Sequence, residues 1–552
     1  MLPLLPDLED LPLPTLVAQM LVVRASGHLF DHQIQYPAWE PPAATLRSWL
    51  VDLGVGGVIL LGGTAAEIGL RTQQLQSWAT IPLLLAADIE EGVGQRFSGA
   101  TWFPPPMALA AIARQNPALA ADYAHQMGAH TAAEALAIGL NWVLAPVVDV
   151  NNNPDNPVIN VRAFGENTGE VSQLTTAFIE GAQTHPVLTA AKHFPGHGDT
   201  ATDSHLELPL IPHPLERLQA VELPPFQAAI AAGVDSVMSA HLLIPALDPD
   251  YPATLSQRIL TGELRQNLGF AGLIVTDALV MGAIANRYGL NEAPLMALEA
   301  GADILLMPLD PAGAIQAICA AVESGRITVD RIKTSVERIW RAKQKVCSPQ
   351  LTASSSHAWE NQPPPPIQLE QLAQPQTIAT ARHILQASQT GKGTLAPIAA
   401  GDQKGWGRNL IIVDQLLDCD FLDRTAPAVQ LPQKYGYRQL TLVDSFTNQL
   451  PEEGAHRPAV GAAQPSTLLQ LFIRGNPFRG SANLNQTAQR WFEFLLETEQ
   501  LSALVIYGSP YILEQFLPHL SSNIPYVFTY GQMPLAQEIA LNQLMANESS
   551  IP

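Results

Sequence analysis

The sequence predicts an α/β protein of two domains, the first of them a (β/α)8 barrel. Three observations predict this class. Short apolar segments alternate with helical segments through about the first 345 residues. Polar residues directly follow many of these apolar segments. A Ser- and Pro-rich stretch then separates this first region from a second α/β pattern. A chain of 552 residues is also too long for one ordinary domain.

Eight apolar segments of the first region are predicted strands, because they are apolar along their whole length, as strands covered on both faces are. They are Met20–Arg24, Gly56–Leu61, Pro82–Ala87, Asn141–Val147, Val187–Ala191, Ser236–Ala240, Gly272–Thr276 and Asp303–Met307. Helical spacing is found between them, for example in Ala43–Asp52, Ala65–Trp78, Leu119–Ile138, Leu215–Ala232 and Pro311–Glu323. This alternation fits either a barrel or a doubly wound open sheet.

The polar residues after the strands favour the barrel. They are Asp88, Asp149, Lys192, His193, His241 and Asp277, and they come from five different predicted strands. A barrel enzyme gathers its functional groups from several strand ends on one face, whereas an open sheet concentrates them near a switch point. We therefore expect a barrel over residues 1–347, closed by the helix Arg331–Val346.

Residues 348–366 form the expected linker, which is rich in Ser and Gln and ends in four prolines. Residues 367–552 then predict a smaller αβα sandwich. Its predicted elements are the helical segment Leu369–Ala387 and the strands Asn409–Val413, Leu468–Ile473, Ala503–Tyr507 and Tyr526–Tyr530. We find little catalytic chemistry in this second region.

Composition excludes several classes of partner. The net charge is −21 without any basic cluster, which argues against nucleic acid and anionic membranes. No uncharged apolar run reaches the roughly 18–20 residues of a membrane helix, and the N-terminus lacks the basic segment of a signal peptide. The three cysteines form neither a disulfide framework nor a zinc pattern. We expect a soluble, cytoplasmic protein; the sequence leaves its oligomeric state open.

The segment KHFPGHGDTATDSH, residues 192–205, concentrates proton-transfer groups in one predicted loop. One interpretation is a structural, glycine-rich barrel loop. A second is a zinc site formed by His193, His197 and His205, although proline and glycine break the helical geometry that suits such spacing. A third is catalysis, in which the Asp203 carboxylate orients His205 and raises the basicity of its free nitrogen.

A second acidic group, Asp277, ends the apolar strand of LIVTDALVMGAI. It could be the N-cap of the helical turn that follows. Alternatively, it is a nucleophile at the barrel mouth that attacks an electrophilic carbon and forms a covalent ester.

These two motifs together resemble those of the family 3 glycoside hydrolases, specifically the bacterial β-N-acetylglucosaminidase branch, in which the Asp-x-His loop is diagnostic. ADIEEGVGQRF resembles the family's sugar-binding segment, and LAPVVDVNNNPDNPVINVRAFGE resembles its next segment. The final strands resemble the family's αβα-sandwich domain. The resemblance covers almost the whole chain and departs at Glu91, where a glycine is usual, and at Val93, where a basic residue is common.

The resemblance implies a retaining exo-β-N-acetylglucosaminidase that hydrolyses terminal β-linked N-acetylglucosamine, with peptidoglycan fragments as the expected substrate. It implies Asp277 as nucleophile, His205 as general acid/base and Asp203 as its partner. It also implies sugar binding by the side chains of Asp88, Arg96, Arg162, Lys192 and His193. Asp149, His241 and Glu90 are expected to support the pocket.

We expect no cofactor and no metal. The alternatives are a β-glucosidase-type or phosphorolytic family 3 enzyme, or a catalytically inactive sugar-binding protein. A neutral imidazole acid/base does not repel an anionic acceptor, so phosphate could take the place of water.

Overall fold

The computed structural model describes residues 5–200, 208–347, 367–398, 407–444, 465–474 and 482–545. The chain divides into two compact units. The first comprises Met1–Phe103, Ala113–Asn156 and Arg162–Thr380, and the second comprises Pro104–Ile112, Pro157–Val161 and Ala381–Pro552. The expected linker 348–366 lies outside the described residues, as do Asp203 and His205.

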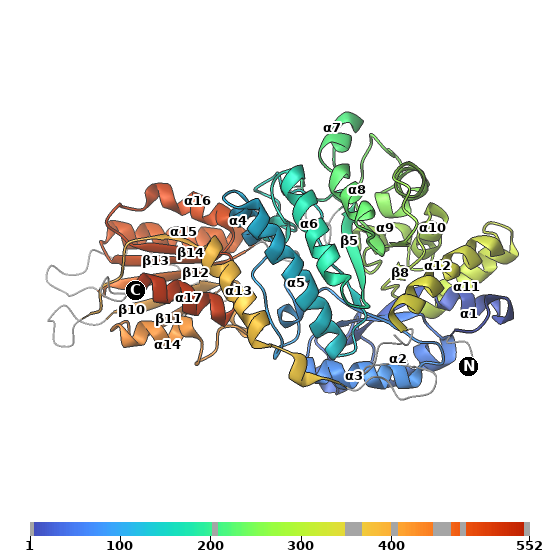
Figure 1. The fold of residues 1–552 in the computed structure, drawn as a ribbon, viewed down its shortest axis with the longest axis horizontal. Coiled ribbons are helices and arrows are strands. Elements are labelled where there is room, and N and C mark those ends of the chain that lie inside the picture. The colour runs from blue at the N-terminus through green and yellow to red at the C-terminus, as the bar shows by residue number, and fades with distance from the viewer. Residues whose placement is uncertain are drawn as a thin grey trace. The chain divides into compact units, whose positions relative to one another are not determined.

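The first unit is built around eight parallel strands, which are coloured blue to yellow-green in Figure 1. They are β1 (Leu21–Ser26), β2 (Gly57–Leu61), β3 (Leu84–Ala87), β4 (Trp142–Val143), β5 (Leu188–Phe194), β6 (Ser236–Ser239), β7 (Leu273–Val275) and β8 (Leu305–Leu306). Their order is β7-β6-β5-β4-β3-β2-β1-β8. A parallel bridge from Val275 to Ile304 joins the two ends of this order, so the sheet returns on itself. The predicted barrel is confirmed.

All eight strands differ by one or more residues from their predicted bounds, and the differences at β4 and β5 have an identifiable cause. The predicted strand Asn141–Val147 shortens to β4, because Pro146 has no N–H to donate to a neighbouring strand. The predicted strand Val187–Ala191 extends to Phe194 and takes in Lys192 and His193. Polar residues in a fully buried strand are not anticipated from hydrophobicity, and each of these two is buried against a carboxylate described below.

Helices surround the barrel and follow the predicted alternation. Those of the first unit up to residue 347 are α1 (Leu13–Ala18), α2 (Ala43–Ser48), α3 (Ala65–Trp78), α5 (Pro117–Ala137), α6 (Thr168–Ala182), α7 (Leu215–Ala220), α8 (Leu223–Ala231), α9 (Gly282–Tyr288), α10 (Glu292–Ala300), α11 (Pro311–Glu323) and α12 (Val329–Cys347), with π-helices at Trp49–Leu53 and Arg258–Asn267. Helix α4 (Met107–Ala113) falls almost entirely in the second unit. The predicted helix Leu215–Ala232 is two helices, because the prolines after Leu223 fit only the first turn of a new one.

Helices α5 and α6 lie side by side along the barrel wall (Figure 1). A Cβ atom on Gly128 of α5 would lie 2.1 Å from the Phe178 carbonyl oxygen, and one on Gly181 of α6 would lie 1.9 Å from that of His125. Glycine at both positions therefore allows the two backbones to touch.

The second unit is a six-stranded sheet of order β11-β10-β12-β13-β14-β9, in which only β9 is antiparallel. The strands are β9 (Thr390–Lys392), β10 (Arg408–Val413), β11 (Gln439–Val443), β12 (Thr467–Ile473), β13 (Leu501–Gly508) and β14 (Tyr526–Thr529). Helices α15 (Ala482–Glu497) and α16 (Pro510–Phe516) cover one face, and α14 (Pro427–Lys434) and α17 (Pro534–Met545) cover the other (Figure 1). Helix α13 (Pro375–Ser388) precedes the sheet.

The predicted αβα sandwich is thereby confirmed. The sequence did not indicate the edge strands β9 and β11, because their side chains are mostly exposed and lack an apolar pattern. In the part of the chain that the structure describes, no helix has the length and apolar character to cross a membrane.

Candidate active site

The candidate residues lie at the carboxyl ends of several barrel strands. Asp88 directly follows β3, and Asp277 lies two residues beyond β7. Lys192 and His193 are in the last part of β5, and Arg162 ends a 3₁₀ helix in the connection after β4. Because the strands of a parallel barrel end on one face, these side chains share the face on which barrel enzymes hold their active sites.

A network of ion pairs joins three of these strand ends. The Lys192 Nζ atom is 2.8 Å from Oδ1 of Asp88 and 2.6 Å from Oε1 of Glu90. Arg162 binds the same Glu90 carboxylate through Nε and Nη2, both at 2.8 Å. The side chains of Lys192 and Glu90 are almost fully buried, whereas that of Asp88 is 35% exposed. Asp88 is therefore the carboxylate of this network that a ligand can reach.

The network keeps its members charged in spite of burial. Burial by itself raises the pKa of Glu90, but Arg162 and Lys192 hold that pKa well below its ordinary value. Burial lowers the pKa of Lys192, and the Asp88 and Glu90 carboxylates more than reverse this and leave it raised. The same balance, with Glu90 as the principal partner, raises the pKa of Arg162. The cations of such a network can donate strong, directional hydrogen bonds to sugar hydroxyls, and its carboxylates can accept them.

A bulge in β5 brings two consecutive side chains to the carboxylates. Consecutive residues of a regular strand point to opposite faces. The pairing of β5 with β6 shifts between Lys192 and Phe194, so His193 has no partner in the register. Lys192 consequently contacts Asp88 and Glu90, while His193 contacts Asp149. Bulges that redirect a side chain in this way are frequent beside active sites.

Asp149 connects His193 to the segment that follows it. Its fully buried carboxylate accepts the His193 backbone N–H at 3.1 Å, the ring Nδ1 at 2.8 Å and the His197 backbone N–H at 2.7 Å. Burial raises the pKa of Asp149, but the His193 ring and His197 lower it further than burial raises it. An ionised carboxylate can only accept, so the Nδ1 atom of His193 carries the proton.

His197 is buried in the same segment and is neutral at neutral pH. Burial lowers its pKa to about 4. Its Nδ1 atom is 2.9 Å from Oγ1 of Thr200, and the Asn156 amide donates to the carbonyls of His197 and Gly198. These bonds fix residues 197–200 immediately before the segment that carries Asp203 and His205.

The histidine rings do not form a recognisable metal centre within the described residues, where no group of three His, Cys, Asp or Glu side chains is arranged to hold a metal ion. The centroids of the His193 and His197 rings are 6.1 Å apart, at an interplanar angle of 79°. The zinc interpretation also requires His205, which lies outside the described residues.

Asp277 stands in a turn and is not the N-cap of a helix. Helix α9 begins at Gly282 and its N-cap is Met281, so the N-cap interpretation of Asp277 is wrong. Oδ1 of Asp277 accepts the N–H of Ala278 at 2.7 Å, and its side chain is half-buried. The buried His241 ring braces this turn, since its Nε2 atom is 3.1 Å from the Ala278 carbonyl.

Arg96, in the segment after β3, is exposed, and its Nε donates to the Asp88 carbonyl at 3.0 Å. The same segment contains a pair of residues that sequence reasoning missed. Glu91, the departure from glycine, is fully buried and accepts the Trp102 indole N–H at 2.9 Å. A buried acid needs a donor, so the substitution itself was a signal that a partner such as Trp102 would be found nearby.

Two family models match the chain. The model of the glycosyl hydrolase family 3 N-terminal domain matches residues 14–342, and that of the bacterial glycosyl hydrolase family 3 C-terminal domain matches residues 401–546. The chain belongs to glycosyl hydrolase family 3. The resemblance to this family is confirmed, and the two models match the barrel region and the sandwich region respectively.

Curated relatives carry related names. Beta-hexosaminidase A of Pseudoalteromonas piscicida is 36% identical over 331 residues, which are 54% of this chain and 54% of the relative. Beta-N-acetylglucosaminidase/beta-glucosidase of Cellulomonas fimi is 34% identical over 301 residues, 53% of this chain and 52% of the relative. The chain thus spans about half the length of these two relatives.

Solved structures match over more of the chain. A glycoside hydrolase family 3 beta-N-acetylglucosaminidase from Paenibacillus sp. str. FPU-7 is 30% identical with a TM-score of 0.75, and the match covers 97% of this chain and 98% of that one. A beta-glucoside phosphorylase has the same TM-score at 22% identity, covering 98% of this chain and 92% of that one. The second likeness shows a shared fold only.

Proposed function

We propose that this protein is a retaining exo-β-N-acetylglucosaminidase that releases terminal β-linked N-acetylglucosamine. The observation that carries the proposal is the buried cluster of Lys192, Glu90 and Arg162 with Asp88 at its exposed edge, on the same barrel face as Asp277. The names of the relatives agree with this substrate. We also propose that the substrates are peptidoglycan fragments in the cytoplasm.

The first half of the reaction breaks the glycosidic bond. The Asp277 carboxylate attacks the anomeric carbon from one face of the sugar, and the leaving oxygen departs with the bonding electrons. His205, held by Asp203, donates the proton that this oxygen needs. The product is a glycosyl ester on Asp277.

The second half releases the sugar. His205, now neutral, takes a proton from water, and the resulting hydroxide attacks the anomeric carbon and expels the Asp277 carboxylate. Two inversions give net retention of the β configuration. General acid–base assistance of this kind contributes typically about 10²–10⁴ in rate.

The ion-pair network binds the terminal sugar in this scheme. Asp88 accepts from a sugar hydroxyl, and Lys192, Arg96 and Arg162 donate. Glu90 and Asp149 hold the donors in place, and His193 contributes its second ring nitrogen. Because Glu90 already fixes Lys192 and Arg162, little conformational entropy is lost when the sugar binds.

Activity on matched aryl glycosides tests the proposal. We expect turnover of the aryl β-N-acetylglucosaminide, with the β anomer as first product by NMR, and far weaker turnover of the aryl β-glucoside. The reverse preference would contradict the acetamido assignment. A glycosyl phosphate as main product when phosphate is added would identify phosphorolysis instead.

Substitution of the nucleophile tests the mechanism. Asp277→Asn is expected to abolish turnover, whereas the matched control Asp330→Asn, at an exposed position of α12, retains it. His205→Ala should reduce turnover of natural oligomers much more than that of aryl glycosides with activated leaving groups. Equal losses on both substrates would argue against His205 as the proton donor.

A further inference from the structure

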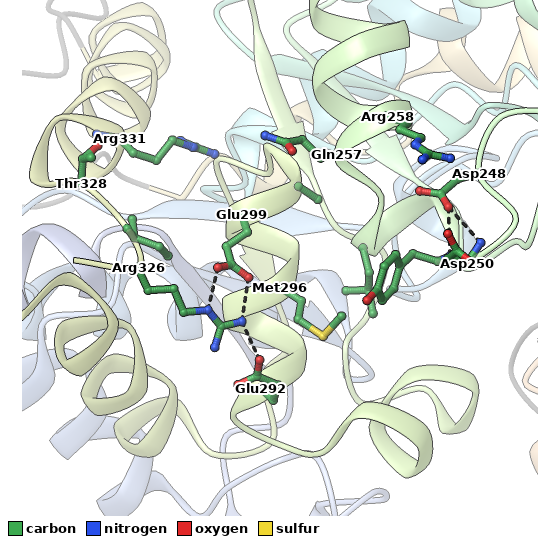
Figure 2. A pocket seen from close by; sticks show the side chains of 14 residues that line it. Asp248, Asp250, Gln257, Arg258, Glu292, Met296, Glu299, Arg326, Thr328 and Arg331 are labelled. Atoms are coloured by element: carbon green, nitrogen blue, oxygen red, sulfur yellow. Dashed lines mark hydrogen bonds and ion pairs between the residues drawn. The ribbon is translucent and has the colours of Figure 1, made fainter. Parts of the chain in front are cut away.

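A cavity of about 870 Å³ lies on the wall of the barrel, away from the candidate active-site residues, none of which lines it. Figure 2 shows its lining. The walls come from the loop after β6 (Asp248–Leu255), the start of the π-helix Arg258–Asn267, helix α10, and the segment Arg326–Arg331 that leads into α12. Its volume is within the range of small-molecule binding sites.

Several charged groups of the lining neutralise one another. Arg326 binds Glu299 through Nε at 2.7 Å and Nη2 at 2.8 Å, and Glu292 through Nη2 at 2.6 Å (Figure 2). The Asp248 carboxylate accepts from the backbone N–H groups of Asp250 and Tyr251 and from the Ser256 hydroxyl. These charges are engaged, so the cavity does not present a strong field of one sign.

Other polar groups of the lining remain available. The side chains of Asp250, Gln257 and Arg258 make no hydrogen bond or ion pair with any residue that the structure describes. Together they supply a carboxylate acceptor, an amide and a guanidinium donor. Next to them, Tyr251 is 44% exposed, although the cavity already removes part of its ring from solvent. Met296 adds an apolar side chain to the lining (Figure 2).

We propose that this cavity is a second, non-catalytic binding site for a neutral saccharide. A ligand rich in hydroxyl groups needs donors and acceptors in one site, and the three available side chains provide both. The apolar face of a sugar ring needs a flat apolar partner, which the exposed face of Tyr251 offers at small entropic cost. An apolar ligand would leave these polar groups unpaired, and an ionic one would meet both signs of charge.

The loop that forms one wall also contacts the nucleophile turn. Leu255 lines the cavity, and the neighbouring Thr254 hydroxyl is 2.8 Å from Nδ1 of His241. The other nitrogen of that ring contacts the Ala278 carbonyl, directly after Asp277. The cavity is therefore connected, through Thr254 and His241, to the turn that contains Asp277.

Titration calorimetry of the full chain with a tetramer of β-1,4-linked N-acetylglucosamine tests the proposal. The choice of this ligand rests on the proposed function, whereas the argument for the second site does not. The chain carries Asp277→Asn to prevent hydrolysis. We expect two binding events. Adding either Tyr251→Ala or Arg258→Ala should weaken one event at least tenfold and leave the other unchanged. Phe30→Ala, an exposed aromatic residue outside the cavity, is the matched control and should leave both unchanged.

The outcomes separate this site from the active site. Binding that neither Tyr251→Ala nor Arg258→Ala affects would overturn the second site and leave the proposed function standing. A single event that both substitutions weaken would support the second site and count against the proposed catalytic pocket. Weakening by Phe30→Ala to the same extent would assign the effect to a general loss of surface contacts and overturn the proposal.

Discussion

Replacing Asp149 by asparagine is expected to destabilise the barrel and change the protonated nitrogen of His193. The carboxylate accepts three N–H groups, two from His193 and one from His197. Asparagine retains one acceptor oxygen, but its amide nitrogen is a donor and opposes the His193 Nδ1–H. The bond at Nδ1 therefore persists only if the amide donates to an unprotonated Nδ1, and all three charge-assisted bonds become neutral bonds worth about 1 kcal/mol less each.

The sum predicts that Asp149→Asn lowers the free energy of unfolding by about 3 kcal/mol. It also predicts that the His193 proton moves from Nδ1 to Nε2, with at least a tenfold loss of kcat/KM, since the ring then presents a donor where it presented an acceptor. Urea unfolding measures the first effect, and ¹⁵N chemical shifts of the imidazole measure the second. Asp155→Asn, exposed in the same connection, is the matched control. A variant with unchanged stability and an unchanged tautomer would refute the reasoning.

Three further predictions concern buried groups. Glu90→Gln leaves two buried cations undercompensated and should cost about 3 kcal/mol of stability, seen as a lower Tm; an unchanged Tm would contradict the network. His197 binds a proton near pH 6.5 when unfolded but only near pH 4 when folded. The free energy of unfolding is therefore unaffected by His197 above pH 6.5 and falls by about 3 kcal/mol between pH 6.5 and pH 4. In urea titrations at several pH values, His197→Asn should reduce this dependence of the free energy of unfolding on pH. Glu91→Gly removes the carboxylate that accepts the Trp102 N–H and should lower the free energy of unfolding by about 1–3 kcal/mol, measured by thermal unfolding; equal or higher stability would argue against this pair.

Much of the fold follows from apolar periodicity. The eight strands and the exact bounds of α3 and α11 were predictable, because Thr64 with Glu67 and Asp310 provide N-caps that mark where these helices begin. The extension of β5 was not, since hydrophobicity does not indicate that a lysine and a histidine will be buried in a strand. They are buried because carboxylates from other strands compensate them, and a single sequence does not show which distant residues become neighbours.

The candidate site was predictable to the same degree. Asp88, Lys192 and Asp277 were assigned to the active-site face because each follows or ends an apolar segment, and the barrel places such positions on one face. The pairing of Glu90 with Arg162, 72 positions apart, depends on the fold of the connections, which carry no periodic pattern.

The bulge at His193 has a consequence for transplanting this site into another barrel. A regular strand that kept both Lys192 and His193 would restore strict alternation along β5. Either the ammonium or the imidazole would then face the hydrocarbon packing behind the strand. A graft that copies the polar residues onto a regular strand of the host would contain the same residues. It would still lose either the contact of Lys192 with its carboxylates or that of His193 with Asp149. A graft must therefore transfer the irregular backbone together with its side chains.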